Sequence, residues 1–303
     1  MSNNRRGFLI QMSAGATALL AQIEPKWKDQ IGLQLYTVRK LLTPAGYDPT
    51  LAKLAEIGYK VVEPADPYNN MQPAEYKRML DKYGLKMYST HAGVTDGPDL
   101  EKQLEGQALM GIKYTTVRLP KPPSSGGPAQ PRPKNTIESV KRSAEQMNKY
   151  GPILKKFGMK QLIHNHAGEF DPLEDGKTTQ YDVLLKYADP AFVTMELDIG
   201  WAYMGGQDVL AMFRKHPGRF ELWHVKDAKY RQADPKLKPT DRARASRIVT
   251  MGEGDIDYKK VFAKAKLAGM KHFVIEQDTA GEGGRDALED CRIACQNLRQ
   301  ILS

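Results

Sequence analysis

The sequence contains very little cysteine. Cys291 and Cys295 are its only two thiols in 303 residues, and they lie one helical turn apart in the last amphipathic segment. Two thiols at this spacing build neither a disulfide framework nor a cysteine-based metal site. They are expected to be small apolar side chains on one face of a helix. A fold that depends on disulfides or on cysteine-bound metal is therefore excluded.

Long hydrophobic runs are lacking as well. Residues 12–21 are only weakly apolar and too few to span a bilayer permanently, so no stable membrane anchor is expected. They follow Arg5-Arg6-Gly7-Phe8-Leu9-Ile10 and end in small residues near Ala21. Residues 1–21 thus resemble a twin-arginine signal peptide, which implies a periplasmic or secreted enzyme that is exported folded. The alternative is an ordinary basic N-terminal tail.

Clustered charge of one sign is also missing. Lys and Arg total 45 and Asp and Glu total 36, which gives a formal net charge of +9. The basic residues are scattered along helical segments and mixed with acids, whereas a nucleic-acid surface concentrates them. We therefore expect a solvated surface with a positive balance and no nucleic-acid partner.

Residues 22–303 alternate short β-rich runs with helical periodicity about eight times. This alternation predicts one α/β domain, a (β/α)₈ TIM barrel. The predicted strands are residues 31–36, 60–63, 86–90, 114–118, 161–164, 193–197, 220–224 and 272–276. The predicted helices are residues 51–57, 73–83, 100–110, 137–157, 179–187, 209–215, 258–268 and 287–302.

Two segments interrupt this rhythm. Residues 120–134 are rich in Pro, Ser and Gly, and residues 226–249 are polar and rich in Lys and Arg. Both follow predicted strands, so both are expected as long loops over the catalytic face of the barrel. At least one of them is expected to cover the substrate.

Polar side chains follow three of the predicted strands. Asp198, His224 and Glu276 each come at the end of an apolar run, where barrel enzymes place their chemistry. Buried charges need partners, and a divalent cation can supply one. Carboxylates and imidazole together suit Mn, Zn, Co or Mg.

These strand ends resemble those of the xylose-isomerase-like barrel superfamily, which includes sugar isomerases and epimerases, inosose dehydratases and endonuclease IV. Asp198 lies in Leu-Asp-Ile-Gly-Trp-Ala, His224 in His-Val-Lys-Asp and Glu276 in Val-Ile-Glu-Gln-Asp. Residues 252–257, Gly-Glu-Gly-Asp-Ile-Asp, resemble the family's turn between strands seven and eight. The resemblance covers nearly the whole chain after residue 21. It implies that Asp198, His224 and Glu276 hold a metal ion.

Strand five departs from the commonest family pattern. Many members end this strand in Leu-Glu-Asn, but this chain has Ile163-His164-Asn165-His166. The resemblance therefore carries the fourth metal ligand to His164. His166 and Glu169 are alternatives, and a buried, hydrogen-bonded structural histidine is a further one.

Candidates for proton transfer are Glu63, Glu196, Lys226 and Glu276. A base that acts next to a carbonyl must be a carboxylate, imidazole or amine close to the reacting carbon. Glu276 is expected to serve both as metal ligand and as base, as the resembling epimerases suggest. Glu63 and Glu196 could instead be buried acids paired with Arg118 or Lys226.

Candidates for substrate contact are His91, Arg118, His166 and Trp201. Hydroxyl-rich ligands need polar groups at the mouth of the barrel, and aromatic rings can stack on sugar faces. His91 and Arg118 end predicted strands three and four. Trp223 alternates outward from His224, so it is expected to pack in the core.

The resemblance implies a divalent-metal-dependent sugar isomerase or epimerase that removes a proton next to a metal-bound carbonyl through an enediolate. The alternative is a lyase of a 3-keto-glycoside or inosose that uses the same metal and base. Endonuclease-type repair is disfavoured because Trp201 stands where a further histidine ligand would follow Asp198. A non-catalytic sugar-binding barrel would have lost the metal set. The expected partner is a small sugar or keto-sugar, and a homo-oligomer is left open.

Overall fold

The computed structural model of the chain describes residues 25–119, 134–230, 234 and 236–303. The predicted signal peptide and nearly all of the predicted loop at residues 120–134 lie outside these residues. In the described part, no helix is both long and apolar enough to cross a membrane.

The core of the fold is a curled, parallel, seven-stranded sheet, as predicted for an α/β barrel. Its strand order is β2-β1-β11-β8-β7-β6-β4. These strands are β1 (Gly32–Gln34), β2 (Val61–Glu63), β4 (Tyr114–Thr115), β6 (Lys160–His164), β7 (Val193–Asp198), β8 (Leu222–Val225) and β11 (His272–Ile275). Short strands β3 (Val94–Thr95) and β5 (Val117–Arg118) pair separately. The predicted strand at residues 114–118 is thus divided into β4 and β5.

The predicted third strand, residues 86–90, forms two isolated bridges instead of a continuous ladder. Lys86 pairs with Val61 of β2, and Ser89 pairs with Tyr114 of β4. The segment changes partner halfway along, so neither ladder is long enough to make a regular strand. It nevertheless fills the gap between β2 and β4, and so closes the barrel.

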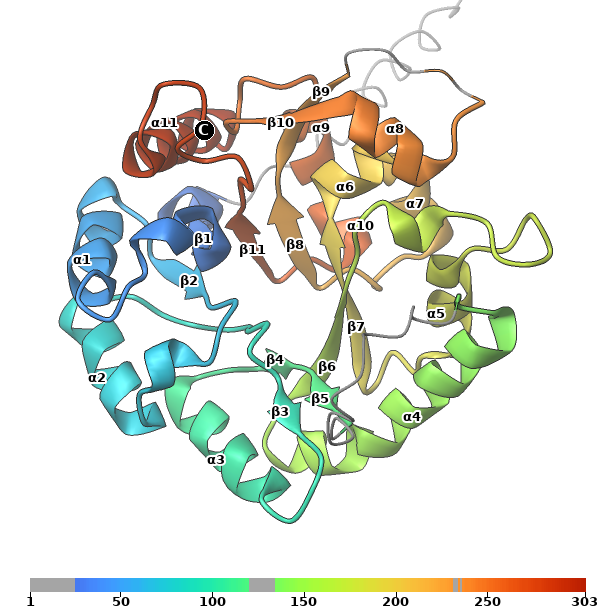
Figure 1. The fold of residues 1–303 in the computed structure, drawn as a ribbon, viewed down its shortest axis with the longest axis horizontal. Coiled ribbons are helices and arrows are strands. Elements are labelled where there is room, and N and C mark those ends of the chain that lie inside the picture. The colour runs from blue at the N-terminus through green and yellow to red at the C-terminus, as the bar shows by residue number, and fades with distance from the viewer. Residues whose placement is uncertain (1–24, 120–133, 231–233, 235) are drawn as a thin grey trace, which may run out of the picture.

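Helices form an outer ring around the strands (Figure 1). Their bounds are α1 (Tyr47–Ile57), α2 (Pro73–Lys82), α3 (Leu100–Met110), α4 (Ile137–Lys156), α5 (Gln180–Tyr187), α6 (Ile199–Met204), α7 (Val209–Lys215), α8 (Pro239–Ala245), α9 (Tyr258–Phe262), α10 (Ala265–Ala268) and α11 (Ala287–Ile301). The 3₁₀ helices are η1 (Pro25–Asp29), η2 (Leu35–Leu41), η3 (Tyr68–Asn70) and η4 (Gly168–Phe170). The predicted helix at residues 258–268 is divided into α9 and α10.

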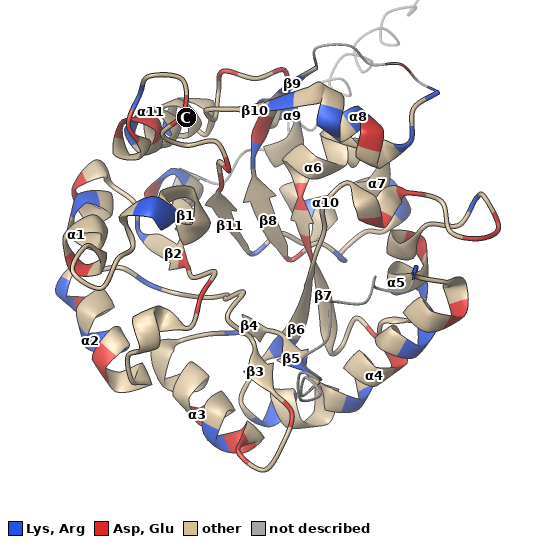
Figure 2. Cartoon of the chain, viewed as in Figure 1, with Lys and Arg blue, Asp and Glu red and all other residues tan. Residues whose placement is uncertain are grey.

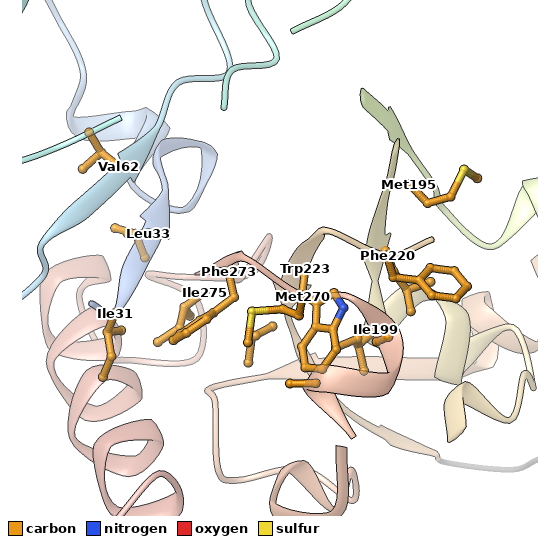
Figure 3. Close-up of a cluster of buried hydrophobic side chains, with 14 of the residues drawn as sticks. Ile31, Leu33, Val62, Met195, Ile199, Phe220, Trp223, Met270, Phe273 and Ile275 are labelled. Atoms are coloured by element: carbon orange, nitrogen blue, oxygen red, sulfur yellow. The ribbon is translucent and has the colours of Figure 1, made fainter. Parts of the chain in front are cut away.

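The main apolar core lies between the strands and this ring of helices (Figure 3). Trp223 is fully buried there and stacks on Phe213, with ring centroids 5.1 Å apart. Its neighbour His224 faces the other side of β8, because side chains alternate along a strand. The prediction that Trp223 packs in the core is confirmed.

The prediction that residues 226–249 form one long loop is wrong. β9 (Asp227–Tyr230) and β10 (Ser246–Val249) pair antiparallel, and α8 lies between them. The ladder joins residues up to 22 positions apart, from Asp227 to Val249, so local composition does not reveal it. Figure 2 shows basic and acidic residues interspersed over the outer helices, as the sequence indicated.

Candidate active site

Polar side chains converge at the carboxyl ends of the barrel strands. Asp198 of β7 and His224 of β8 are direct partners in the parallel register. His164 of β6 is likewise paired with Glu196 of β7. Because alternate residues of a strand share a face, the inward side chains of neighbouring strands meet in one layer.

Four of these residues bring one ligand atom each within 4.8 Å of one another: His164, Asp198, His224 and Glu276. We call them the four-donor set, and they are the metal ligands that the sequence predicted. Asp198 and His224 are fully buried, and Glu276 is 7% exposed. Two imidazoles and two carboxylates match the nitrogen and oxygen ligands that divalent transition metals take in proteins.

The state of the donors fits a cation. Of the described side chains, none makes a hydrogen bond to Nδ1 of His164, although this atom is buried. Oδ2 of Asp198 has an ammonium as its neighbour, Nζ of Lys226 at 3.0 Å. Burial, and next the neighbouring His224, lower the pKa of His164 well below its ordinary value. A neutral imidazole with a free nitrogen is the form that binds metal.

Asp198 is held in place by its surroundings. Its Oδ1 atom caps helix α6 by accepting a hydrogen bond from the amide of Trp201 at 2.8 Å. Asn165 exchanges two hydrogen bonds with the backbone of Asp198, at 3.1 and 3.2 Å. Only Oδ2 is thereby directed to the centre of the site.

Lys226 is an internal cation beside the four-donor set. Its Nζ atom lies 3.0 Å from Asp198, 2.9 Å from Glu276 and 2.6 Å from Asp278. A Cβ on Gly200 would lie 2.5 Å from the carbonyl oxygen and 2.7 Å from the Cβ of Lys226. The glycine of Leu-Asp-Ile-Gly-Trp-Ala therefore allows β8 to approach α6 this closely.

Glu63 and Glu196 form a second layer, deeper in the barrel. His224 Nε2 lies 2.8 Å from Glu63, and His91 Nε2 lies 2.6 Å from Glu196. Among the described residues, neither acid forms an ion pair with Arg118 or Lys226, so the predicted alternative of such a pair is wrong. Arg118 instead donates to the backbone carbonyl of His91. Each acid has an imidazole as its partner.

The two acids differ in their electrostatics. Burial raises the pKa of Glu63, but the neighbouring His91 and His224 outweigh it and hold this pKa at about 2. Burial, and next the charge of Glu63, raise the pKa of Glu196 to about 7. Two carboxylates that share a buried site cannot both ionise readily, which moves their pKa values apart. Glu63 is thus the permanently charged member of the pair.

The structure places the three candidates for the strand-five ligand differently. His164 belongs to the four-donor set, whereas His166 and Glu169 do not. Glu169 accepts a hydrogen bond from the backbone amide of His166 at 2.8 Å, and His166 itself is exposed. His164 is therefore the member of this segment that the fold directs toward the other donors.

A cavity of about 300 Å³ opens over the four-donor set. It is lined by Gln34, Tyr36, Ala65, His91, His164, His166, Glu276 and Asp278. His91 and His166 therefore lie where substrate contacts were predicted. Arg118 lines a neighbouring cavity of about 400 Å³, which shares His91 and His164 with the first.

Trp201 lies beside the site and not over it. Its ring centroid is 5.5 Å from that of His166 and 5.1 Å from Nζ of Lys226. It lines neither of the two cavities that His91 and His164 share. Stacking of Trp201 on a substrate stays a prediction.

Sequence reasoning missed Asp278, Gln34 and Asn165. Asp278 binds Lys226, Gln34 donates to Glu63, and Asn165 orients Asp198. Period-two alternation was the signal available for Asp278, which lies two residues beyond Glu276. Gln34 could have been found in the same way, since it ends β1 as Glu63 ends β2.

The turn at residues 252–254 is organised by Asp227. One carboxylate oxygen of Asp227 accepts hydrogen bonds from the amides of Gly252 and Gly254, each at 2.9 Å. A Cβ on Gly254 would lie 1.9 Å from this carboxylate. The Asp of His-Val-Lys-Asp and the glycine-rich motif are therefore one structural unit beside the site.

Comparison with known proteins agrees with this architecture. Residues 51–298 match the family of xylose isomerase-like TIM barrels. Inosose dehydratase of Geobacillus kaustophilus is 26% identical over 254 residues, which cover 77% of this chain and 81% of the dehydratase. The match to the family covers most of the chain.

Two solved structures share the fold. A sugar phosphate isomerase/epimerase from Parabacteroides distasonis superposes with a TM-score of 0.66 at 24% identity, covering 94% of this chain and 96% of the other. The IolI protein, whose structure contains a zinc atom, superposes with a TM-score of 0.63 at 14% identity. The match covers 90% of this chain and 98% of IolI.

The chain belongs to the xylose isomerase-like TIM barrel family. Members of this fold place their reacting groups at the carboxyl ends of the strands, where the four-donor set lies.

Proposed function

We propose that the protein is a divalent-metal-dependent lyase that removes a proton next to the carbonyl of a keto-polyol or keto-sugar and then eliminates water. The convergence of the four donors within 4.8 Å, under an open cavity, carries this proposal. The similarity to inosose dehydratase favours elimination over isomerisation.

The four-donor set is the place for the cation. A divalent cation bound there supplies positive charge that polarises a carbonyl and stabilises the negative charge that develops when the proton leaves. Zn and Mn both suit two imidazoles and two carboxylates.

Proton transfer is assigned to groups at the cavity wall. His91 lines the cavity, its side chain is 25% exposed, and Glu196 holds its Nε2 atom from behind. Glu276 is the other wall group that can take a proton. Elimination also needs an acid for the departing hydroxyl. Lys226 does not line the cavity, and its ammonium lies behind the wall against Glu276 and Asp278, so a proton from Lys226 would reach the hydroxyl through these carboxylates.

The cavity wall favours an uncharged substrate. Of the described residues that line the 300 Å³ cavity, none is Lys or Arg, and two are acids, Glu276 and Asp278. A phosphate group would need Lys or Arg donors at this wall to balance its charge beside these two acids. The proposed substrate is therefore a phosphate-free keto-polyol, such as an inosose or a 3-keto-glycoside.

A second candidate function is isomerisation or epimerisation of a sugar. The structural similarity to the isomerase/epimerase from Parabacteroides distasonis favours it. Both reactions begin with the same proton abstraction, so the product distinguishes them. An unsaturated or dicarbonyl product indicates the lyase, and an epimer or aldose–ketose pair indicates the isomerase.

The experiment is a substrate panel in D₂O. The protein is loaded with Zn or Mn and incubated with inososes, 3-keto-glycosides and free ketoses, and NMR follows deuterium incorporation and product formation. Elimination of water from a keto-polyol supports the proposal. Exchange that ends in an epimer contradicts it and supports the second candidate.

Export is also part of the proposal. The arginine pair at residues 5 and 6 and the small-residue run up to residue 21 support it. Fractionation of cells expressing the full chain, compared with the Arg5→Lys/Arg6→Lys variant, tests it. A protein that reaches the periplasm equally well in both forms would contradict twin-arginine export.

A further inference from the structure

His224 uses its two ring nitrogens in opposite directions. Nδ1 lies 2.8 Å from Glu276 and 3.8 Å from Asp198, both in the four-donor set. Nε2 lies 2.8 Å from Oε1 of Glu63, on the other side of the ring. The imidazole therefore stands between the four-donor set and a buried carboxylate behind it.

A bound cation would set the tautomer of His224. A cation that uses the lone pair of Nδ1 requires the ring proton to be on Nε2. Glu63 is the nearest acceptor for that proton. Carboxylates behind metal-bound imidazoles fix the ring and raise its basicity, and their loss weakens metal binding.

Glu63 is itself held rigidly. Its Oε1 atom also accepts a hydrogen bond from Gln34 at 2.8 Å, and its Oε2 atom accepts one from Ser89. Gln34 and Glu63 are register partners on β1 and β2. Because the Gln34 amide and the Ser89 hydroxyl both donate to it, Glu63 is kept as an acceptor.

Glu63 is poorly placed to act as a base. It is completely buried and does not line the 300 Å³ cavity. Glu196 is not the partner of His224 either, because it lies 3.5 Å from Nε2 and only 2.6 Å from His91. Each deep carboxylate thus serves a different imidazole.

We infer that Glu63 is a positioning residue: it holds His224 in the orientation and tautomer in which Nδ1 faces the four-donor set. This inference rests on the proposed cation site. It removes Glu63 from the candidate bases that the sequence indicated and gives it a role in cation affinity.

The test measures cation binding directly. Metal-stripped wild type and Glu63→Gln are titrated with Zn²⁺ or Mn²⁺ by calorimetry. Glu221→Gln is the matched control, because Glu221 is a largely buried glutamate at the opposite end of the barrel. We expect Glu63→Gln to weaken binding by roughly 10- to 100-fold, and Glu221→Gln to leave it unchanged.

A second readout follows the imidazole itself. Side-chain nitrogen shifts of His224 report which ring nitrogen carries the proton, and we expect the Nε2–H form to lose population in Glu63→Gln. If this variant does not fold, Gln34→Met removes one donor to Glu63 and is measured in its place, with a smaller expected loss of affinity.

Three results would overturn the inference. One is a variant affinity within twofold of wild type. Another is cation affinity equal to that of wild type together with a loss of deuterium exchange into the substrate, which would make Glu63 the base. The third is a fall from two bound cations to one, which would make Glu63 a ligand. Wild type that binds no cation would instead contradict the proposed function, and it is measured first.

Discussion

The two ends of the barrel handle buried charge in opposite ways. At the amino ends of the strands, the carboxylate of Glu221 accepts three hydrogen bonds. The donors are Lys160 at 2.7 Å, Lys271 at 3.0 Å and the hydroxyl of Tyr114 at 2.8 Å. Both oxygens of its carboxylate are therefore satisfied by neighbouring side chains. This arrangement needs nothing further to be stable.

The carboxyl ends of the strands carry an excess of acid. Lys226 faces three carboxylates, Asp198, Glu276 and Asp278. Glu63 and Glu196 have imidazoles as partners. Buried carboxylates without full compensation are costly. The amino end thus pairs its buried charge fully, whereas the carboxyl end retains the excess negative charge on which the proposed cation site rests.

The largest expected effect comes from Asp198→Asn. Asparagine keeps the helix cap to Trp201 but removes the charge from Oδ2. Since Asp198 is a direct member of the four-donor set, cation affinity should fall by more than the roughly 10- to 100-fold expected for an outer partner. Calorimetric titration measures this.

The control for this variant is Asp208→Asn. Asp208 caps helix α7 through Ala211 in the same way, but it lies outside the site. Equal cation binding by Asp198→Asn and Asp208→Asn would show that the two aspartates do not differ as the account requires.

Lys226→Met should come next in size. Among the described residues, Lys226 is the ammonium that these three carboxylates share, and removing one partner of a buried ion pair costs about 3–5 kcal/mol of unfolding free energy. Zn²⁺ or Mn²⁺ should restore part of this loss. Urea unfolding without the cation measures the loss of unfolding free energy, and urea unfolding with it measures the part that the cation restores.

Lys271→Met provides the contrast at the other end. The Lys271 side chain is 55% exposed, so this change should cost no more than about 1 kcal/mol and should not respond to cations. Equal losses of unfolding free energy in Lys226→Met and Lys271→Met would contradict the claim that the two ends of the barrel differ in how their buried charge is compensated.

Glu221→Ala tests the amino end directly. It leaves Tyr114 and Lys160 without their acceptor, and we expect a loss of about 1–3 kcal/mol of unfolding free energy. Cation affinity should remain that of wild type. A parallel loss of cation binding would mean that the two ends are coupled through the strands.

The last prediction concerns pH. Burial, and next the charge of Lys271, lower the pKa of His272 to about 4, against 6.5 when unfolded. The unfolded chain therefore binds a proton more readily, so stability is fully present above about pH 6.5 and falls as the pH drops toward 4.

His272→Phe removes this proton but keeps an aromatic ring to stack on Tyr88. Between pH 6.5 and 4 the variant should lose about 2–3 kcal/mol less unfolding free energy than wild type. Urea unfolding at several pH values measures the slope. Identical slopes would show that His272 titrates normally in the fold.

Much of this architecture follows from local pattern. Apolar runs that end in Asp198, His224 and Glu276 predicted both the strands and the end of the barrel where the chemistry lies. Strand alternation placed His224 inward and Trp223 outward. These inferences succeeded because each depends on residues adjacent in sequence.

Pairing across the barrel could not be predicted in the same way. The hydrogen bond between His224 and Glu63 joins residues 161 positions apart, and the β9–β10 ladder depends on partners separated by a helix. Residues 86–90 have the composition of a strand, but their backbone bonds are shared between two neighbours. Such features depend on tertiary geometry.

The most direct test of the account is to locate the cation. Crystals of the protein grown with Mn²⁺ or Zn²⁺, measured at the metal absorption edge, give an anomalous peak at the bound ion. The account predicts one ion within coordination distance of His164, Asp198, His224 and Glu276. A peak elsewhere, or none at this site with Lys226 still between Asp198 and Glu276, would contradict it.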